Sequence, residues 1–157
     1  MLVVISGPTA TGKSALAVDL AQRVQGVILG ADSRQIYQEF NIGTAKPDAT
    51  ARTQVWHQLI DWVSPRRTVT VAEYQATAET LIRNWHAMGV IPFLVGGTGL
   101  YIQAITAGLR IPQVPPQPEL RQELTHIGQT TCYAWLQQVD VDSAARIHPH
   151  DQVRTLR

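Results

Sequence analysis

A glycine-rich stretch near the N-terminus constrains the fold of this chain more than any other part of its sequence. Residues 7–14 read GPTATGKS and directly follow the apolar run Leu2–Ile5. The pattern G-x-x-x-x-G-K-[ST] between a strand and a helix is typical of a P-loop, whose backbone N–H groups surround a phosphate. We therefore expect a buried strand at Leu2–Ile5, a loop at Gly7–Gly12 and a helix from Lys13 to about Val24.

The residue types of this loop suit a di- or triphosphate. Glycines allow the backbone to curl, the N-terminus of the helix attracts an anion, and Lys13 adds a mobile positive charge. The Ser14 hydroxyl is a candidate Mg²⁺ ligand. The loop alone does not distinguish a nucleotide from another diphosphate. The predicted phosphate-binding residues are Gly7, Pro8, Thr9, Ala10, Thr11, Gly12, Lys13 and Ser14.

Two further apolar runs predict a parallel sheet. Val27–Leu29 and Ile91–Val95 are short and uninterrupted, as in strands that are buried on both faces. The segment Gly30–Pro47 lacks periodicity and is interpreted as a long functional loop. The fold class predicted is α/β, a P-loop NTPase-like core whose parallel sheet is flanked by helices.

Helical periodicity places the flanking helices. In the first helix, Leu16, Leu20 and Val24 recur every four residues and are expected to face the core, with Gly26 as the C-terminal cap. A second helix is expected at Val71–Met88. Its start carries a capping box, Thr70 and Glu73, and its apolar face runs from Val71 to Met88; a third helix ends near Ala107.

A proline-rich segment, Ile111–Pro118, divides the chain. We expect domains at residues 1–113 and 114–157, the second being the beginning of a helical insertion with short helices in Glu119–Val139 and Asp142–Ile147. Because three strands are few for such a sheet, we also expect the sequence to be part of something longer.

Composition limits the class of protein without naming it. The 157 residues carry a formal net charge of +1, which argues neither for nor against nucleic acid. A lone cysteine, Cys132, cannot form an intrachain disulfide, and no apolar run is long enough to span a bilayer. We expect a cytoplasmic protein with no membrane partner.

Two polar positions follow the other predicted strands, at the edge where open α/β sheets bind ligands. Asp32 comes after Val27–Leu29 and has three possible roles: Mg²⁺ ligand, general base, or cap of the segment that follows. Gly96-Gly97-Thr98-Gly99 follows Ile91–Val95, with small residues that allow another molecule close to the backbone and a hydroxyl on Thr98.

Other residues are interpreted as structural. His57 is expected to be packed or capping, Trp56 and Trp85 to lie in the core or a cleft wall, and Cys132 to be inert. The pair Arg66-Arg67 is expected to be solvated.

Four motifs in order resemble one family, the tRNA dimethylallyltransferases. They are GPTATGKS at 7–14, ADSRQIY at 31–37, NIGTAKP at 41–47 and LVGGTGLY at 94–101; RIHPHD at 146–151 and the arginines after it resemble a later family segment. The resemblance covers nearly the whole chain. It implies transfer of a dimethylallyl group from dimethylallyl diphosphate to the exocyclic amine of the tRNA adenosine that is 3′-adjacent to the anticodon, with Mg²⁺.

The resemblance also implies roles for single residues. Lys13 and Thr9 would act on the leaving diphosphate and Ser14 would hold Mg²⁺, while Asp32 would accept the amine proton. The residues that would contact tRNA are Asp32, Ser33, Arg34, Gln35, Thr98, Arg154 and Arg157. A monomer is expected, acting on the anticodon stem-loop, and a substantial C-terminal portion would be absent from this sequence.

Three alternatives stay open. A transferase acting on free AMP or ADP would share these motifs. A small-molecule or nucleotide kinase would need the same loop and an acidic residue after a strand. A non-enzymatic fragment would bind diphosphate or RNA without turnover.

Overall fold

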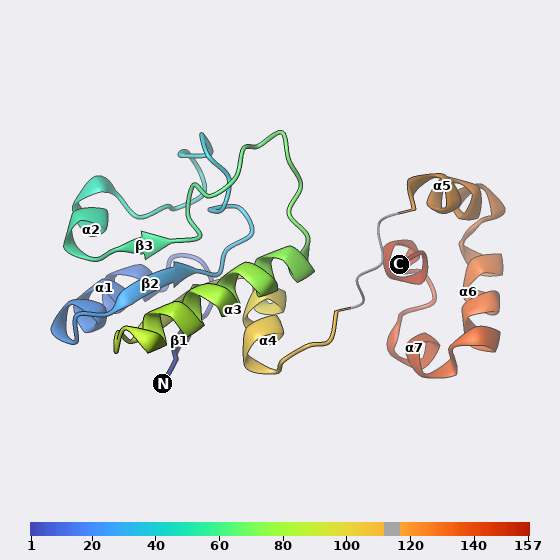
Figure 1. The fold of residues 1–157 in the computed structure, drawn as a ribbon. Coiled ribbons are helices and arrows are strands. Elements are labelled where there is room, and N and C mark those ends of the chain that lie inside the picture. The colour runs from blue at the N-terminus through green and yellow to red at the C-terminus, as the bar shows by residue number, and fades with distance from the viewer. Residues whose placement is uncertain (112–116) are drawn as a thin grey trace. The chain divides into compact units, whose positions relative to one another are not determined.

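The computed structural model describes residues 1–111 and 117–157. By its contacts, the chain divides into two compact units, Met1–Gln113 and Val114–Arg157 (Figure 1). Most of the proline-rich segment and the predicted domain boundary lie outside the described residues.

The first unit contains a parallel four-stranded sheet in the order β1-β4-β2-β3. Three strands lie where apolar runs predicted them; their bounds are β1 Val3–Ser6, β2 Val27–Gly30 and β4 Pro92–Gly96. The fourth, β3 at His57–Gln58, was missed because two residues make no apolar run. Since β4 lies between β1 and β2, with Ser6 opposite Gly96 and Gly30 opposite Val95, the carboxyl ends of these three strands meet. The α/β fold class is confirmed.

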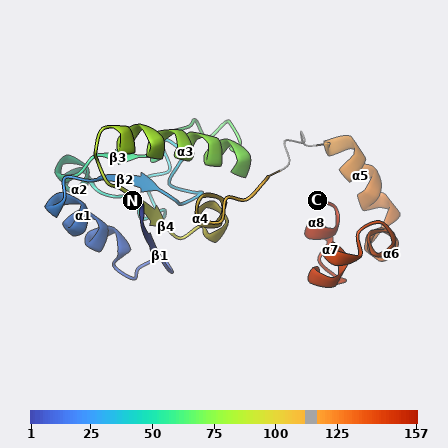
Figure 2. The ribbon, with the colours of Figure 1, turned by 60° about the horizontal axis from the view of Figure 1, so that its bottom comes forward.

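Helices cover both faces of this sheet. Helix α1 (Lys13–Arg23) packs on the face formed by Ile28, Phe93 and Val95. Helices α3 (Val71–Ala87) and α4 (Gly99–Thr106) cover the opposite face, where Leu29 and Leu94 lie. Figure 2 shows α1 and α3 on the two sides of the strands. The short helix α2 (Ala49–Gln54) precedes β3 and is capped by the Asp48 side chain, which accepts from Ala51 N.

The predicted buried face of α1 is wrong. Ala17, Val18 and Ala21 are the buried residues, whereas Leu16, Leu20 and Val24 are 51%, 37% and 47% exposed. Small side chains allow the helix backbone to lie close to the sheet, so close packing selected the alanine stripe over the larger leucines beside it.

Gly26 also has a different role from the predicted cap. The left-handed residue after α1 is Gln25, with φ 51°, and Gly26 N then donates to Ala21 O over 2.8 Å. A Cβ on Gly26 would lie 2.6 Å from the Phe93 ring and 2.7 Å from Ile91 O. Glycine is needed here because strand β4 passes directly beside it.

Strand β1 is less buried than its sequence predicts. Its residues alternate between half-buried and exposed, because β4 is its sole strand neighbour among the described residues. Val4 is accordingly exposed, whereas every residue of β2 and β4 is buried.

Helix α3 begins at Val71, as predicted, and ends at Ala87, one residue before the predicted end. The Thr70 hydroxyl accepts from Glu73 N at 3.1 Å, and Gly89 follows the helix with φ 73°. The second half of the predicted capping box is not seen, because the Glu73 carboxylate pairs with Arg67. Arg66 and Arg67 are both exposed, as predicted, and Arg67 is in addition ion-paired. Along the predicted apolar face, only the last residue, Met88, is exposed.

A buried aromatic pair fixes α3 to the sheet. Tyr74 is fully buried and stacks on Tyr101 of α4 at a ring distance of 3.8 Å, and its hydroxyl donates to Gly30 O at 2.9 Å. Burial raises the pKa of Tyr74, with a smaller contribution from Tyr101, so the hydroxyl keeps its proton at neutral pH. The bond thus connects the helix to the end of β2, next to Asp32.

Changing Tyr74 to phenylalanine should lower the free energy of unfolding by about 1–2 kcal/mol, because the Gly30 carbonyl loses a buried donor. Urea denaturation followed by circular dichroism measures the change. Tyr37→Phe is the control, since the Tyr37 hydroxyl makes no hydrogen bond within residues 1–111 and 117–157. An unchanged midpoint for Tyr74→Phe would contradict a stabilising role for this bond.

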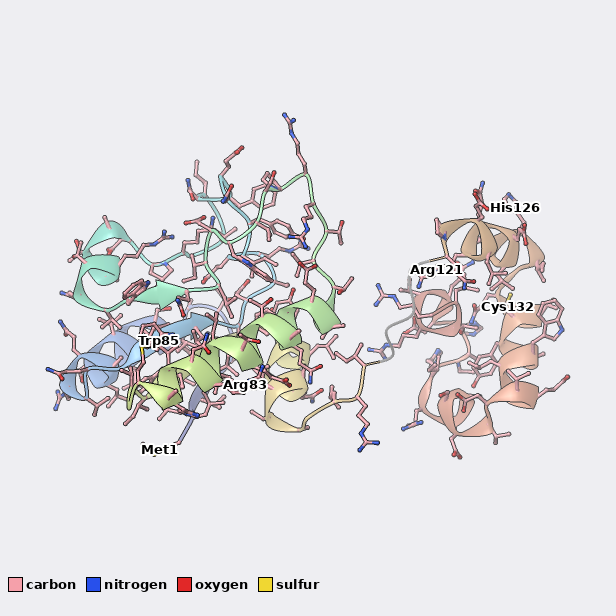
Figure 3. All side chains as sticks on the ribbon, viewed as in Figure 1. Met1, Arg83, Trp85, Arg121, His126 and Cys132 are labelled. Atoms are coloured by element: carbon pink, nitrogen blue, oxygen red, sulfur yellow. The ribbon has the colours of Figure 1, made fainter. Side chains whose placement is uncertain are left out.

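The second unit is helical. Its helices are α5 Pro118–Ile127, α6 Gln129–Val139, α7 Val141–Arg146 and α8 Gln152–Thr155, which agrees with the predicted short helices. The Tyr133 hydroxyl donates to Ala144 O and Ile147 O, so it links α6 to α7. Cys132 is buried near the start of α6, where its thiol donates to Leu124 O of α5 (Figure 3). Among the described residues, no helix has the length and apolar character that crossing a bilayer requires.

Candidate functional site

The loop between β1 and α1 has the backbone of a phosphate-binding loop. Gly7, Ala10 and Gly12 have φ angles of 155°, 67° and 82°, and the Thr11 hydroxyl donates to Pro8 O at 2.9 Å. Gly12 caps α1 without any side-chain hydrogen bond. The first N–H groups of α1 are therefore directed at the loop without a side-chain partner, where an anion can accept from them.

Lys13 points back over this loop. Its ammonium donates to the Pro8 carbonyl and lies 3.5 Å from the Thr11 hydroxyl. A negatively charged ligand inside the loop would offer the ammonium stronger partners than these neutral oxygens. Lys13 is thus placed to move from the loop carbonyl to a phosphate oxygen.

Changing Lys13 to methionine should weaken the binding of inorganic diphosphate about 10- to 100-fold, the effect of losing one hydrogen bond to a charged group. Isothermal titration of the chain with diphosphate measures the dissociation constant. Arg23→Gln is the matched control, because it removes a positive charge from the exposed, far end of the same helix. Equal affinities for the Lys13 variant and the control would exclude a direct contact.

One cavity of about 180 Å³ brings together residues from three strand ends. Its wall contains most of the P-loop, from Thr9 to Ser14, together with Asp32 and Gln35 after β2 and Gly96 and Gly97 after β4. The remaining lining residues are Ala15, Ala17, Ile28, Gly30, Thr44, Ala45, Pro47, His57, Ile60 and Val95. The predicted phosphate loop and the predicted acidic residue therefore face the same space.

Asp32 is half-buried and uses one of its two carboxylate oxygens locally. Oδ1 accepts from Arg34 N at 2.8 Å and from Gln35 N at 3.4 Å, which makes Asp32 the cap of the turn that follows β2. Within the described part of the chain, Oδ2 makes no hydrogen bond. The capping role left open by the sequence is therefore present, and it leaves one oxygen available to act as a base or a metal ligand.

The turns after β2 and β4 are tied to each other. Ser33 N donates to the Thr98 hydroxyl at 2.9 Å, and Thr98 N donates to Ala31 O at 3.0 Å. The predicted tRNA-contacting hydroxyl of Thr98 thus fixes the segment that follows Asp32. The small residues of Gly96-Gly97-Thr98-Gly99 are expected to let another molecule approach the backbone. At Gly96 the close neighbour is instead the Ala31 backbone of the same chain.

The sequence predicts a functional loop at Gly30–Pro47 but does not single out Thr44, Ala45 and Pro47, which form part of the cavity wall. These residues lie in a segment without helix or strand. The Gln35 amide holds this segment in place by donating to Thr44 O at 2.9 Å and to Ala45 O at 3.0 Å. Their sequence signals were the lack of periodicity in Gly30–Pro47 and the motif NIGTAKP, and neither of these gives a position in space.

His57 lines the same cavity, although the sequence favoured a packed residue. Its Nδ1 lies 2.8 Å from Val55 O, so this nitrogen carries the proton in the neutral ring. Burial lowers the pKa of His57, which the hydrogen bond to Val55 opposes and the charge of Arg52 reinforces. The ring is therefore neutral at pH 7, and it is half-buried at the cavity wall. Trp56, expected in the core or a cleft wall, is 66% exposed and meets Trp85 edge-to-face.

The predicted residues of the helical unit stay predictions. Arg154 is exposed, with its Nε 3.4 Å from Asp151 Oδ2, and Arg157 is exposed as well. Both belong to the second compact unit.

The cavity suits a cation that relies on its substrate for ligands. The hydroxyl of Ser14 and the carboxylate of Asp32 both line it, and the described residues contain no cluster of three or more histidine, cysteine or acidic side chains. Mg²⁺ typically takes one or two protein oxygens and fills its remaining positions with water and substrate phosphate. The residues present therefore fit Mg²⁺ bound together with a diphosphate.

The parallel sheet, the P-loop before α1 and the shared cavity define a P-loop α/β protein. Comparison with family models narrows this class. The IPP transferase model matches residues 35–157, and the isopentenyl transferase model matches residues 1–67. The chain belongs to the IPP transferase family.

Curated relatives support the same family. The chain is 62% identical to a protein named tRNA dimethylallyltransferase from Thermosynechococcus vestitus, over 99% of its own length and 50% of the relative's. It is 60% identical to the protein of that name from Acaryochloris marina, with 99% and 52% covered. The chain therefore spans about half the length of the curated relatives it matches.

Solved structures share the fold. A tRNA isopentenylpyrophosphate transferase from Bacillus halodurans is 39% identical, with a TM-score of 0.69, over 99% of this chain and 53% of that one. A eukaryotic dimethylallyltransferase described as acting on tRNA is 28% identical, with a TM-score of 0.84, over 99% of this chain and 40% of that one.

Proposed function

We propose that this chain supplies the diphosphate site and the base of a tRNA dimethylallyltransferase. The reaction moves a dimethylallyl group from dimethylallyl diphosphate to the exocyclic amine of the adenosine 3′-adjacent to the anticodon, giving N6-(dimethylallyl)adenosine. The observation that carries the proposal is that the P-loop, Asp32 and Gln35 line one cavity. The names of the relatives that match 99% of the chain support it.

The P-loop stabilises the leaving group. When the C–O bond of the allylic diphosphate breaks, positive charge grows on carbon and negative charge grows on the departing oxygens. The N–H groups at the start of α1 and the Lys13 ammonium lie at the loop that would hold these oxygens, and Thr9 adds a hydroxyl. Ser14 would hold Mg²⁺, which when bound neutralises further charge on the diphosphate.

Asp32 takes the proton. The amine nitrogen forms the new bond to carbon as the bond to the diphosphate breaks, and it must then lose a proton. The Asp32 oxygen that is not bonded to Arg34 N or Gln35 N is the acceptor. The other oxygen holds the turn, so the base is fixed in place before the substrate arrives.

The residues after Asp32 face the reacting adenine. Alkylation of its amine requires the adenosine to leave its stack, and Ser33, Arg34 and Gln35 directly follow the general base Asp32 in sequence. The Gln35 amide nitrogen already bonds to two carbonyls, so its oxygen is the atom left to accept from an adenine amine. Thr98 contacts the tRNA beside them, while Arg154 and Arg157 bind backbone phosphates of the anticodon stem-loop.

The remaining expectations complete the proposal. The protein works as a monomer in the cytoplasm, where tRNA is modified, and has no membrane partner. The adenylate isopentenyltransferase alternative is less well supported, since the matched relatives are named for tRNA. None of the relatives and solved structures named above is described as a kinase or as an inactive protein, so these two alternatives gain no support from them.

A transfer assay tests the proposal. The chain is incubated with Mg²⁺ and labelled dimethylallyl diphosphate, together with an anticodon stem-loop in one reaction and AMP in another. A second protein, in which the chain is followed by the C-terminal half of the Thermosynechococcus relative, is assayed in parallel. Label in the stem-loop with either protein supports the proposal. Label in AMP alone, or no label with both proteins, overturns it.

A further inference from the structure

The cavity has one wall without regular secondary structure, which we call the pocket loop, residues 38–47. Thr44, Ala45 and Pro47 of this loop line the cavity, and residues 38–47 form neither a helix nor a strand. A wall of this kind holds its shape only through side-chain contacts, because it has no backbone ladder. The contacts that converge on the pocket loop therefore decide how well the cavity is defined.

The strongest of these contacts meet at Asp61. Its Oδ1 accepts from the Lys46 ammonium at 2.6 Å, and its Oδ2 accepts from Arg52 Nη1 at 2.7 Å. Lys46 belongs to the pocket loop, and Arg52 belongs to α2. One carboxylate thus binds the loop and the helix that follows it at the same time.

Both cations extend this link to the loop backbone. The Lys46 ammonium also donates to Tyr37 O at 2.6 Å, directly before the pocket loop. Arg52 Nε donates to Pro47 O at 3.0 Å, at the loop's last residue. The two ends of the pocket loop are therefore held through the two partners of Asp61.

The backbone of Asp61 joins the same network. Asp61 N donates to Gln35 O at 3.1 Å, and the Gln38 side chain donates to Asp61 O at 3.2 Å. Asp61 has a φ of 51°, a left-handed conformation that aspartate tolerates better than most residues. The carboxylate therefore points from a fixed position in the chain.

Gln35 connects this network to the catalytic turn. Its amide nitrogen donates to Thr44 O and Ala45 O, while its backbone N–H donates to the Asp32 carboxylate. The pocket loop is held by Asp61 on one side and by the turn that carries the base on the other. Movement of the loop would reach Asp32 through Gln35.

The charges make the link difficult to replace. The Lys46 side chain is 4% exposed, so its ammonium has lost most of its water and depends on Asp61 for a negative partner. Burial acts to raise the pKa of Asp61, but the hydrogen bonds and charges of Lys46 and Arg52 outweigh it and hold the pKa below its usual value. Asp61 is therefore ionised at neutral pH.

We propose that Asp61 is a positioning residue of the transfer site, which holds the pocket loop against the cavity through Lys46 and Arg52. The expected effect on kcat rests on the proposed function, because it assumes that the cavity carries out prenyl transfer. Asp61 does not line the cavity. Its effect passes through the loop, and a displacement of reacting groups by about 1 Å is enough to slow a reaction on the order of 100-fold.

The first test is kinetic. Asp61→Asn leaves one acceptor oxygen for two cations, and kcat for stem-loop prenylation should fall about 10- to 100-fold. The KM for dimethylallyl diphosphate should change less than about threefold, since the P-loop makes no contact with Asp61. Asp19→Asn is the matched control, because it removes an exposed carboxylate paired with Arg23 on α1. A kcat within about twofold of the control would overturn the proposal.

The second test needs no turnover. Hydrogen exchange by mass spectrometry should show faster exchange in a peptide covering residues 37–47 of Asp61→Asn, while a peptide covering Gly7–Leu20 stays unchanged. Arg52→Gln removes a half-exposed partner, so it should keep the fold and produce a smaller change of the same kind. Unchanged exchange of residues 37–47 in both variants would overturn the proposal. Faster exchange, when neither the chain nor the chain joined to the C-terminal half of the Thermosynechococcus relative transfers label, would support the positioning role while rejecting the proposed function.

Discussion

Asp32→Asn is expected to slow prenyl transfer to the stem-loop by about 10²- to 10⁴-fold, the usual contribution of a general base. Asparagine keeps an oxygen that can accept from Arg34 N and Gln35 N, so the turn after β2 should survive. Its other atom is an amide nitrogen, which cannot accept a proton from the substrate amine. The change therefore removes the base while leaving its support in place.

Single-turnover assays and calorimetry separate the possible roles of Asp32. Binding of dimethylallyl diphosphate to Asp32→Asn should stay within about twofold of the parent, since the P-loop is intact. Asp32→Ala removes the cap as well, so it should lose transfer to the same degree and loosen the turn. If Asp32→Asn transfers normally, Asp32 is a cap and not the base. If it loses diphosphate binding, Asp32 is chiefly a metal ligand.

Gly96→Ala is expected to lower the free energy of unfolding by about 3 kcal/mol or more, at the upper end of what overpacking costs. An added Cβ would lie 2.8 Å from the Ala31 Cα and nearer still to the Ala31 carbonyl group. Neither backbone can retreat easily, because Ala31 N donates to Val95 O at 2.7 Å and Thr98 N donates to Ala31 O at 3.0 Å. The strain falls on the backbone that carries Asp32.

Urea denaturation of Gly96→Ala measures this effect, and Gly99→Ala is its control. Gly99 opens α4, and a Cβ there would meet nothing within 4 Å, so the control should be neutral or slightly stabilising. A midpoint for Gly96→Ala equal to that of the control would show that the two turns can separate without cost.

The predictable part of the fold follows local pattern. The apolar runs that became β2 and β4 and the periodicity of α3 need no knowledge of distant residues. The face of α1 could not be predicted in this way, because Leu16 and Leu20 are locally better core residues than Ala17 and Ala21. The buried face is determined by close packing against Phe93 and Val95, which are far away in sequence.

The site divides along the same line. The P-loop and Asp32 could be predicted to share an edge, because parallel strands end together. The position of the pocket loop could not be predicted, because it depends on contacts among Gln35, Lys46 and Asp61. The motifs that contain Gln35 and Lys46 do not reveal that these side chains meet in space. The substrate-contacting roles of Ser33, Thr98, Arg154 and Arg157 stay predictions.

The contact between Lys13 and the Pro8 carbonyl makes ligand binding an exchange of partners. A ligand gains the ammonium only when the loop gives it up, so the measured affinity is a difference between two interactions. A chloride ion offers one charge and few contacts, whereas a diphosphate offers several charged oxygens to the ammonium and to the helix N–H groups at once. The loop should therefore bind a diphosphate in preference to a monovalent anion such as chloride.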